Sequence, residues 1–186
     1  MRVGLRYVRL QLFLLSLLLL AAPVVQAEFK VADIKARVLD GALVLNGALQ
    51  LELSRKVEEA VSKGIELPVL IDVRLSRRRA FLWDQRIASW LLRRTLRYHA
   101  LSGQYLVGTG DSFDSFSLPV DALRHLGTLN EVRLPLSTDA PSESELVVNL
   151  RVHIDIESLP APLRPVAYTT LSWHLNSGWT AWDVPR

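Results

Sequence analysis

Alternation of apolar and polar residues is the feature that most constrains how this chain can fold, and it is clearest over residues 146–157. Apolar residues stand at every second position from Val148 to Ile156, with Asn, Arg, His and Asp between them. Successive side chains of a β-strand point to opposite faces, so the pattern predicts a strand with one buried and one exposed face. Residues 29–39, 43–53 and 67–75 show the same period, which is typical of antiparallel sheets covered on one side.

Turn and capping residues complete the prediction of fold class. Asp40-Gly41 is a two-residue hairpin signal between the first two of these strands. Ser54 as N-cap and Gly64 as stop predict a helix at about residues 54–63, and similar signals predict one at about 118–126. Strand–helix–strand series do not occur. We therefore expect a mainly β (α+β) fold, a single domain of about eight or nine mostly antiparallel strands, sandwich-like or a strongly curved sheet, with two short helices.

Four shorter segments have their own predictions. Residues 109–116 and the acidic residues 137–145 are predicted to be loops, because neither shows a sustained period. The proline-rich residues 160–165 predict a stiff connector. Residues 166–175 predict a last strand, and residues 179–184 a short strand that returns from it.

The N-terminal residues have the three parts of a secretory signal peptide. Residues 1–9 hold three arginines and no acid, residues 10–22 are almost wholly apolar, and small residues at Val25 and Ala27 precede Glu28. We expect cleavage after Ala27, which leaves residues 28–186 as one β-rich domain in the periplasm. The alternative is an inner-membrane anchor formed by uncleaved residues 10–25, although this stretch is shorter than the ~20 residues that usually span a bilayer. Membrane contact is expected only if the segment is retained.

Removing the signal peptide changes the charge of the chain. The whole sequence has 22 Lys and Arg and 19 Asp and Glu, and three of the arginines but no acid lie in residues 1–27. The remainder is therefore neutral, with 19 residues of each sign. A general nucleic-acid binder would be basic as a whole, so nucleic acid is not an expected partner. Cysteine is absent, which excludes disulfides and thiolate metal sites.

Arginine and aromatic residues are concentrated in residues 77–107, which we predict to form the long central hairpin of the domain. Apolar residues at alternate positions from Ala88 to Tyr98 share the parity of a buried face, and Arg94 interrupts them. Either a β-bulge near Arg93-Arg94 re-aims the side chain, or Arg94 lies on the covered face and needs a carboxylate. Both alternatives are open from the sequence.

The arginines of this hairpin are the predicted interaction surface, because guanidinium groups suit carboxylates and phosphates. An acidic envelope protein, a lipid headgroup or an anionic envelope polymer would fit them. The alternative is a solvated strand face whose arginines pair with acids elsewhere in a neutral domain. The predicted surface comprises Arg77, Arg78, Arg79, Arg86, Arg93, Arg94 and Arg97.

The C-terminal tail supplies a second candidate site. Trp173, Trp179 and Trp182 lie close together in the sequence and could line a groove for a small apolar ligand or lipid. Tryptophans at strand spacing are more often core or edge-covering residues, so a structural role is the alternative.

The sequence motifs that could indicate a catalytic or metal site are weak. Gly110-Asp111-Ser112 resembles the nucleophile turn of one group of serine esterases, but Asp-x-x-His is missing before His174, where Leu171 occupies the acid position. His153, Asp155 and Glu157 would share a strand face, and such faces are commonly solvated rather than metal-binding. We expect no metal, no cofactor and no enzymatic activity. A hydrolase would need His99 or His174 within reach of a buried Asp and an exposed Ser.

Four blocks of sequence together resemble the Gram-negative family catalogued as domain of unknown function 4390. They are residues 53–67, 93–106 (RRTLRYHALSGQYL), 118–126 and 158–182, which contains WHLNSGW near its end. The resemblance spans nearly all of residues 28–186. It implies an exported protein of unknown activity, with no catalytic residues to carry over. Members of the family are often encoded beside sensor histidine kinases of the nitrogen-regulation type, which implies an accessory role in signalling or envelope homeostasis.

These observations rank three functions. The first is a non-catalytic periplasmic interaction module that docks through the Arg-rich hairpin 77–107 onto an envelope protein, such as a sensor-kinase system, or an anionic envelope component. The second is a binder of a small apolar ligand or lipid near the three tail tryptophans. The third is a hydrolase.

Overall fold

The computed structural model of the 186-residue chain describes residues 28–79, 84–137 and 145–185. The predicted signal peptide and its alternative as an anchor lie outside these residues, as does most of the predicted acidic loop. The elements are β1 (Phe29–Leu39), β2 (Ala42–Leu51), α2 (Arg55–Ser62), β3 (Leu67–Arg77), β4 (Gln85–His99), β5 (Gln104–Thr109), β6 (Ser112–Phe116), α3 (Pro119–Gly127), β7 (Thr128–Pro135), β8 (Leu146–Ile154), η1 (Ile156–Ser158), α4 (Arg164–Thr169), η2 (Leu171–Trp173) and β9 (Thr180–Asp183).

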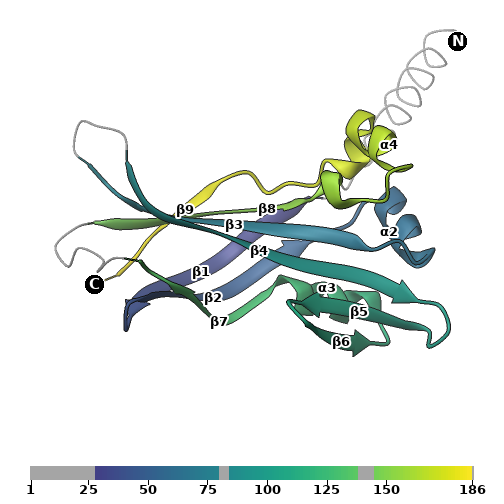
Figure 1. Cartoon of the computed structure of the whole chain (residues 1–186), viewed down its shortest axis with the longest axis horizontal. Coiled ribbons are helices and arrows are strands. Elements are labelled where there is room, and N and C mark those ends of the chain that lie inside the picture. The colour runs from purple at the N-terminus through teal and green to yellow at the C-terminus, as the bar shows by residue number, and fades with distance from the viewer. Residues whose placement is uncertain (1–27, 80–83, 138–144, 186) are drawn as a thin grey trace, which may run out of the picture.

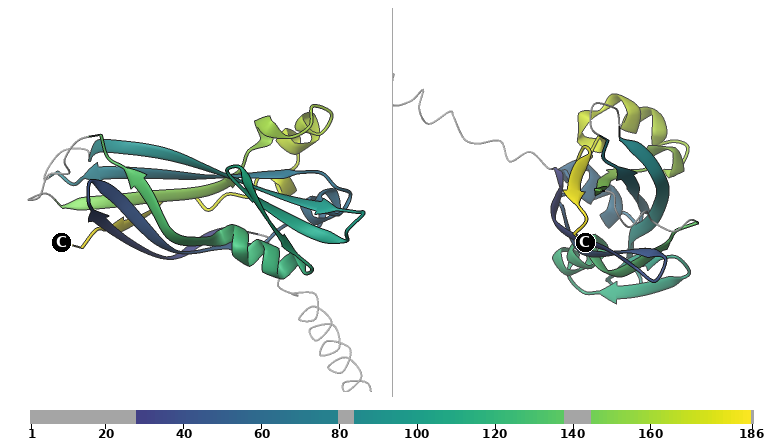
Figure 2. Two further views of the ribbon diagram at one scale, coloured as in Figure 1. Left: turned by 60° about the horizontal axis from the view of Figure 1, so that its bottom comes forward. Right: turned by 90° about the vertical axis from the view of Figure 1, so that its left-hand side faces the viewer.

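The strands form two antiparallel sheets that lie against each other (Figure 1). One sheet has three strands in the order β1-β2-β7, and the other has six in the order β6-β5-β4-β3-β8-β9. Figure 2 shows α3 beside the three-stranded sheet and α4 on the opposite side of the molecule. The strands run along the long axis, so each sheet has a long solvent face.

One hydrophobic core joins the two sheets. It receives alternate residues of β3 and β8, such as Ile71 and Leu150, and meets Leu43 and Leu45 from β2. Helix α2 contributes Val57 and Val61, and its N-cap Ser54 accepts a hydrogen bond from the Val57 amide, as the sequence signals indicate. Burial on one face of each sheet is what the alternating pattern predicts.

The predicted fold class is confirmed. The described residues hold nine antiparallel strands, and α2 and α3 lie where the two short helices are expected. The hairpin within residues 77–107 is β4–β5. No helix among the described residues has both the length and the hydropathy needed to cross a bilayer.

Three local predictions are wrong. Strand β9 (Thr180–Asp183), expected to return from residues 166–175, pairs with β8 instead. Residues 112–116 are not loop but strand β6, which pairs with β5 across a two-residue turn at Gly110-Asp111. Residues 166–175 are not a strand. They contain α4 and η2, because Pro165 in the first turn of α4 fixes a helical φ and Ala167 then packs into the core.

Candidate functional site

Strand β4 divides its side chains between the core and solvent. Leu96 is buried, and Trp90, Leu92 and Tyr98 pack against the core, as their shared parity predicts. The intervening positions, such as Arg93 and Arg97, are exposed on the other side of the sheet. The solvent face of the six-stranded sheet is therefore an arginine-rich surface, and it is the candidate functional site.

Arg94 does not belong to this surface, which corrects the prediction that it is part of an interaction site. Its side chain is 8% exposed and lies on the covered face of β4. The β3–β4 register is regular here and shifts only between Leu75 and Ser76, so no bulge re-aims the arginine. Its Nη1 donates hydrogen bonds to the carbonyl oxygens of Leu126 at 2.6 Å and Thr128 at 2.7 Å.

The acceptors of Arg94 also differ from the prediction. A carboxylate is expected for a buried guanidinium, but the structure provides backbone carbonyls at the C-terminus of α3. The last carbonyls of a helix lack intrahelical partners and carry the negative end of the helix dipole, so a cation suits them. Burial lowers the pKa of Arg94 from its ordinary value. Arg94 therefore ties β4 to α3 and has a structural role.

An ordered set of charged side chains occupies the centre of the solvent face. Asp72 on β3 lies opposite Arg151 on β8, and its carboxylate accepts hydrogen bonds from Arg151 Nε at 3.0 Å and Nη2 at 2.7 Å. The guanidinium of Arg74 stacks 3.8 Å from the centre of the Trp179 ring, and that of Arg151 lies 4.9 Å from it. These contacts fix two arginines and one tryptophan relative to one another.

His153 lies in the same part of the face and is half-buried. Its Nδ1 is 3.5 Å from an Asp72 oxygen and has no hydrogen-bond partner among the described residues. Burial, followed by the charge of Arg151, lowers the pKa of His153 from its ordinary value. This shift favours the neutral imidazole, so the arginines supply the positive charge of this face.

The remaining predicted arginines have different surroundings. Arg93 Nη1 donates to Ser158 Oγ at 3.0 Å and lies 3.5 Å from Asp155. Arg78 pairs with Asp183 at 3.0 Å at the far end of the sheet. Arg79 donates to Gln85, and Arg77 is half-buried with an Nε that has no partner among the described residues.

Arg86 and Arg97 are the exposed arginines of β4 that make no ion pair to any described residue. Leu91 lies between them on the same strand and is 59% exposed. Leu91, Asp72 and Arg151 are successive partners across β4, β3 and β8. The face thus combines an exposed leucine and an exposed tryptophan with arginines on either side.

The three tail tryptophans do not form the predicted groove. Trp173 is buried in the core beside η2, whereas Trp179 lies on the solvent face of the six-stranded sheet. Trp182 pairs with Val148 and packs against the core from the inner side of the sheet. The three rings therefore point into different environments and cannot bind one ligand together.

An apolar cleft instead lies between α2 and α3. It has a volume of about 340 Å³, and its apolar wall includes Leu53, Val61, Leu96, Tyr105 and Leu123. Arg55, Glu58 and Glu59 form its polar edge. This is the lower part of the size range of small-molecule sites, about 300–1,000 Å³. No local sequence pattern indicates this cleft, because its walls come from segments up to 70 residues apart.

The residues considered for catalysis and metal binding stay apart. His99 Nδ1 contacts Ser102 Oγ at 3.0 Å within its own turn, and His174 Nε2 lies 3.1 Å from the Tyr168 carbonyl oxygen. Strand β8 ends at Ile154, so Asp155 and Glu157 do not continue the face of His153. Within the described ranges, no group of three or more His, Asp and Glu residues could hold a metal ion.

One histidine–carboxylate pair was not predicted. His125 Nε2 on α3 lies 3.0 Å from an Asp114 oxygen on β6, and both side chains are largely exposed. The signal that could have found it is the Gly110-Asp111 turn, which creates β6 and brings Asp114 back towards α3. Solvent exposure makes this a surface pair rather than a catalytic one.

Comparison with known proteins places this fold in a family. The family model described as Domain of unknown function (DUF4390) matches residues 26–183. The chain belongs to this family. The match begins two residues before the first described residue of the DUF4390 domain and includes all nine strands.

The other comparisons add no relative to the DUF4390 domain. No curated protein and no solved structure matches the chain. The family resemblance predicted from the four sequence blocks is thus confirmed, and the family description carries no activity. The function of the domain has to be argued from its surfaces.

Proposed function

We propose that this domain is a non-catalytic interaction module of the cell envelope, exported to the periplasm, and that it binds an acidic protein surface through the solvent face of its six-stranded sheet. The observation that carries the proposal is the composition of that face. Arg74, Arg86, Arg93 and Arg97 lie on the same face of the sheet as exposed Leu91, and Trp179 stacks against Arg74. Arginine and tryptophan are enriched at the energetic centres of protein interfaces.

The charge balance of the face favours an acidic partner. Asp72, the half-buried carboxylate of this face, is already engaged by Arg151. Asp155, just beyond the end of β8, is likewise engaged by Ser158 and Arg93. Arg86 and Arg97 remain without an acidic partner among the described residues. Carboxylates on a partner would satisfy these guanidinium groups, and complementary charge would speed the encounter.

The rigidity of the face also supports binding. Long arginine side chains lose rotamer freedom when a partner immobilises them, which costs about 0.5–1.5 kcal/mol for each side chain. Arg151 is already held by two hydrogen bonds to Asp72, and Arg74 by its contact with Trp179. Both side chains are therefore already ordered in the folded domain, and a partner that binds the centre of the face causes a smaller loss of rotamer freedom.

The sequence of residues 1–27 supports export, because it has the basic, apolar and small-residue parts of a signal peptide. A periplasmic location places the face among envelope proteins and away from nucleic acid. The neutral net charge of residues 28–186 agrees with a local docking surface rather than with general binding of polyanions.

Charge reversal at both unpaired arginines, Arg86→Glu with Arg97→Glu, is expected to weaken partner binding by at least about tenfold, because it replaces attraction by repulsion. The measurement is photo-crosslinking from Leu91, replaced by a cysteine that carries the crosslinker, in intact periplasm. The absence of native cysteine makes the label specific. The captured partner is identified, purified and titrated against each variant at two salt concentrations.

The matched control is Lys35→Glu with Arg133→Glu, which makes the same charge change on exposed positions of the three-stranded sheet. This variant should bind as the parent does. Equal binding by the folded Arg86/Arg97 variant would contradict the proposal. So would a crosslinked product that is lipid or polysaccharide rather than protein.

The cleft between α2 and α3 favours a second candidate, the binding of a small apolar ligand. Leu123→Trp should fill the cleft and reduce ligand occupancy, whereas Leu118→Trp adds the same ring at an exposed position outside its walls. Native mass spectrometry of the purified protein measures the bound mass in each variant. A parent protein that carries no added mass and takes up none from a lipid extract would contradict this candidate.

A further inference from the structure

One end of the molecule exposes apolar side chains on separate, firmly held segments. Leu101 in the β4–β5 turn is 96% exposed and Leu171 in η2 is 85% exposed, and these are the two most exposed large apolar residues of the described chain. Val166 and Tyr168 on α4 are about half exposed. A single exposed leucine is ordinary, but several exposed apolar side chains gathered at one end of a domain can mark a site of interaction with a protein or a membrane.

These segments belong to the same end. Helix α4 packs against η2, η2 against α2, and α2 against β4, so they follow one another across the end of the sandwich. Figures 1 and 2 show α4, α2 and the β4–β5 turn at the end opposite the β1–β2 turn. The segments that carry the exposed leucines therefore lie at the same end of the sandwich.

Each leucine is presented by a fixed backbone. In the β4–β5 turn, the Gly103 amide donates to the His99 carbonyl at 2.9 Å and the Ser102 amide donates to His99 Nδ1 at 3.3 Å. In η2, Ser54 Oγ donates to the Ser172 carbonyl at 2.7 Å, and the neighbouring Trp173 is buried in the core. Neither leucine can readily fold back to cover itself.

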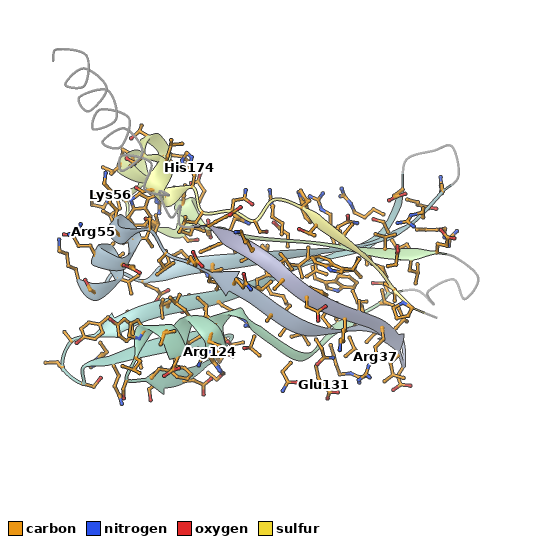
Figure 3. The ribbon with its side chains drawn as sticks, turned by 180° about the vertical axis from the view of Figure 1, so that it is seen from behind. Arg37, Arg55, Lys56, Arg124, Glu131 and His174 are labelled. Carbon is orange, nitrogen blue, oxygen red and sulfur yellow. The ribbon has the colours of Figure 1, made fainter. Side chains whose placement is uncertain are left out.

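Cationic residues accompany the leucines. Figure 3 places Arg55, Lys56 and His174 together at this end, and Arg55 and Lys56 are exposed at the start of α2. Neither residue forms an ion pair with a described residue. Of the two acidic residues on the same helix, Glu59 pairs with Lys63 at 2.6 Å, whereas exposed Glu58 forms no ion pair with a described residue.

The chain also enters the described structure at this end. Phe29, the first residue of β1, pairs with Leu51, and Leu51 lies four residues before α2. Residues 1–27, which include the apolar stretch at residues 10–25, therefore precede in sequence a strand that starts beside α2. A bilayer reached by that stretch would lie next to the exposed leucines.

We propose that this end of the domain rests on the surface of an anionic phospholipid bilayer, with Leu101 and Leu171 inserted at the level of the headgroups. A protein partner would need a matching pocket for each protruding leucine, whereas a fluid bilayer needs no shape match. Apolar side chains combined with nearby Arg and Lys are the composition of interfacial membrane contacts. The contact leaves the sheet face free, because that face runs along the length of the domain.

The test uses the full chain, which lacks cysteine, with single labels at Leu101→Cys or Leu171→Cys. An environment-sensitive fluorophore at either position should shift to the blue on adding phosphatidylethanolamine–phosphatidylglycerol vesicles. It should also be quenched by spin-labelled lipid. The control is Leu39→Cys, since Leu39 is an exposed leucine beside the β1–β2 turn at the opposite end.

Removing the leucines should remove the contact. With the label on Ser62→Cys, an exposed position of α2 that forms no ion pair, the added pair Leu101→Asp and Leu171→Asp is expected to reduce lipid quenching at least about fivefold. Replacing Leu39 by Asp should leave it unchanged. Labels at residues 101 and 171 that respond no more than the label at residue 39 would overturn the proposal, whether or not residues 1–27 remain attached.

Discussion

Replacing Arg94 by alanine is expected to lower the free energy of unfolding by about 3–5 kcal/mol, because it leaves two buried carbonyl groups without a donor. The Leu126 and Thr128 carbonyls accept short hydrogen bonds from Arg94 Nη1. Charge-assisted hydrogen bonds contribute about 1.5–3 kcal/mol each, and the truncated side chain also leaves a cavity beside α3. Urea unfolding followed by tryptophan fluorescence measures the effect.

Three further variants distinguish the loss of hydrogen bonds from the loss of volume as the cause of the lower stability. Arg94→Lys keeps a cation but shortens its reach to the carbonyls, so an intermediate loss is expected. Arg94→Met keeps most of the volume and loses the donors, and should be nearly as unstable as the alanine variant. The control Arg97→Ala, at an exposed position of the same strand, should change stability by less than about 0.5 kcal/mol. An Arg94→Met variant as stable as the parent would show that the carbonyls need no donor.

Arg94 also shows how far the sequence could predict the site. Strand alternation correctly identified it as the anomaly on a buried face, because parity depends only on local spacing. The acceptors of Arg94 could not be predicted, because they are backbone carbonyl groups at a helix C-terminus and no residue type in the sequence identifies them. The expected carboxylate was therefore wrong even though burial was one of the two alternatives considered.

The predictions for the C-terminal residues 166–184 were wrong for a different reason. Trp179 and Trp182 are three positions apart at β9, so strand parity already puts them on opposite faces. Sequence proximity had suggested a shared groove. The helix α4 was missed because a short apolar segment fits strand and helix periods equally, although Pro165 was a helix-start signal. The α2–α3 cleft depends on tertiary packing and had no local signal.

The second large effect is expected at Gly127, where α3 meets β2. A Cβ atom added there would lie 2.2 Å from the Leu49 carbonyl oxygen and 3.2 Å from its carbon. Real contacts of this kind do not occur, so α3 or β2 would have to move. Because Leu126 and Thr128 flank this glycine, any shift would also disturb the acceptors of Arg94. Gly127→Ala should therefore cost about 3 kcal/mol, at the upper end of overpacking effects.

Gly108 offers the matched comparison, because it too is buried and close to its neighbours. Its added Cβ would meet Thr95 Oγ1 at 2.5 Å and the Phe113 ring at 2.9 Å. Phe113 is 60% exposed and can swing into solvent, whereas the Leu49 backbone is held within β2. Gly108→Ala should thus cost less than half as much as Gly127→Ala in urea unfolding. Equal losses would mean that α3 adjusts as easily as a surface side chain, and the tie between Arg94 and α3 would then be a weak constraint on the fold.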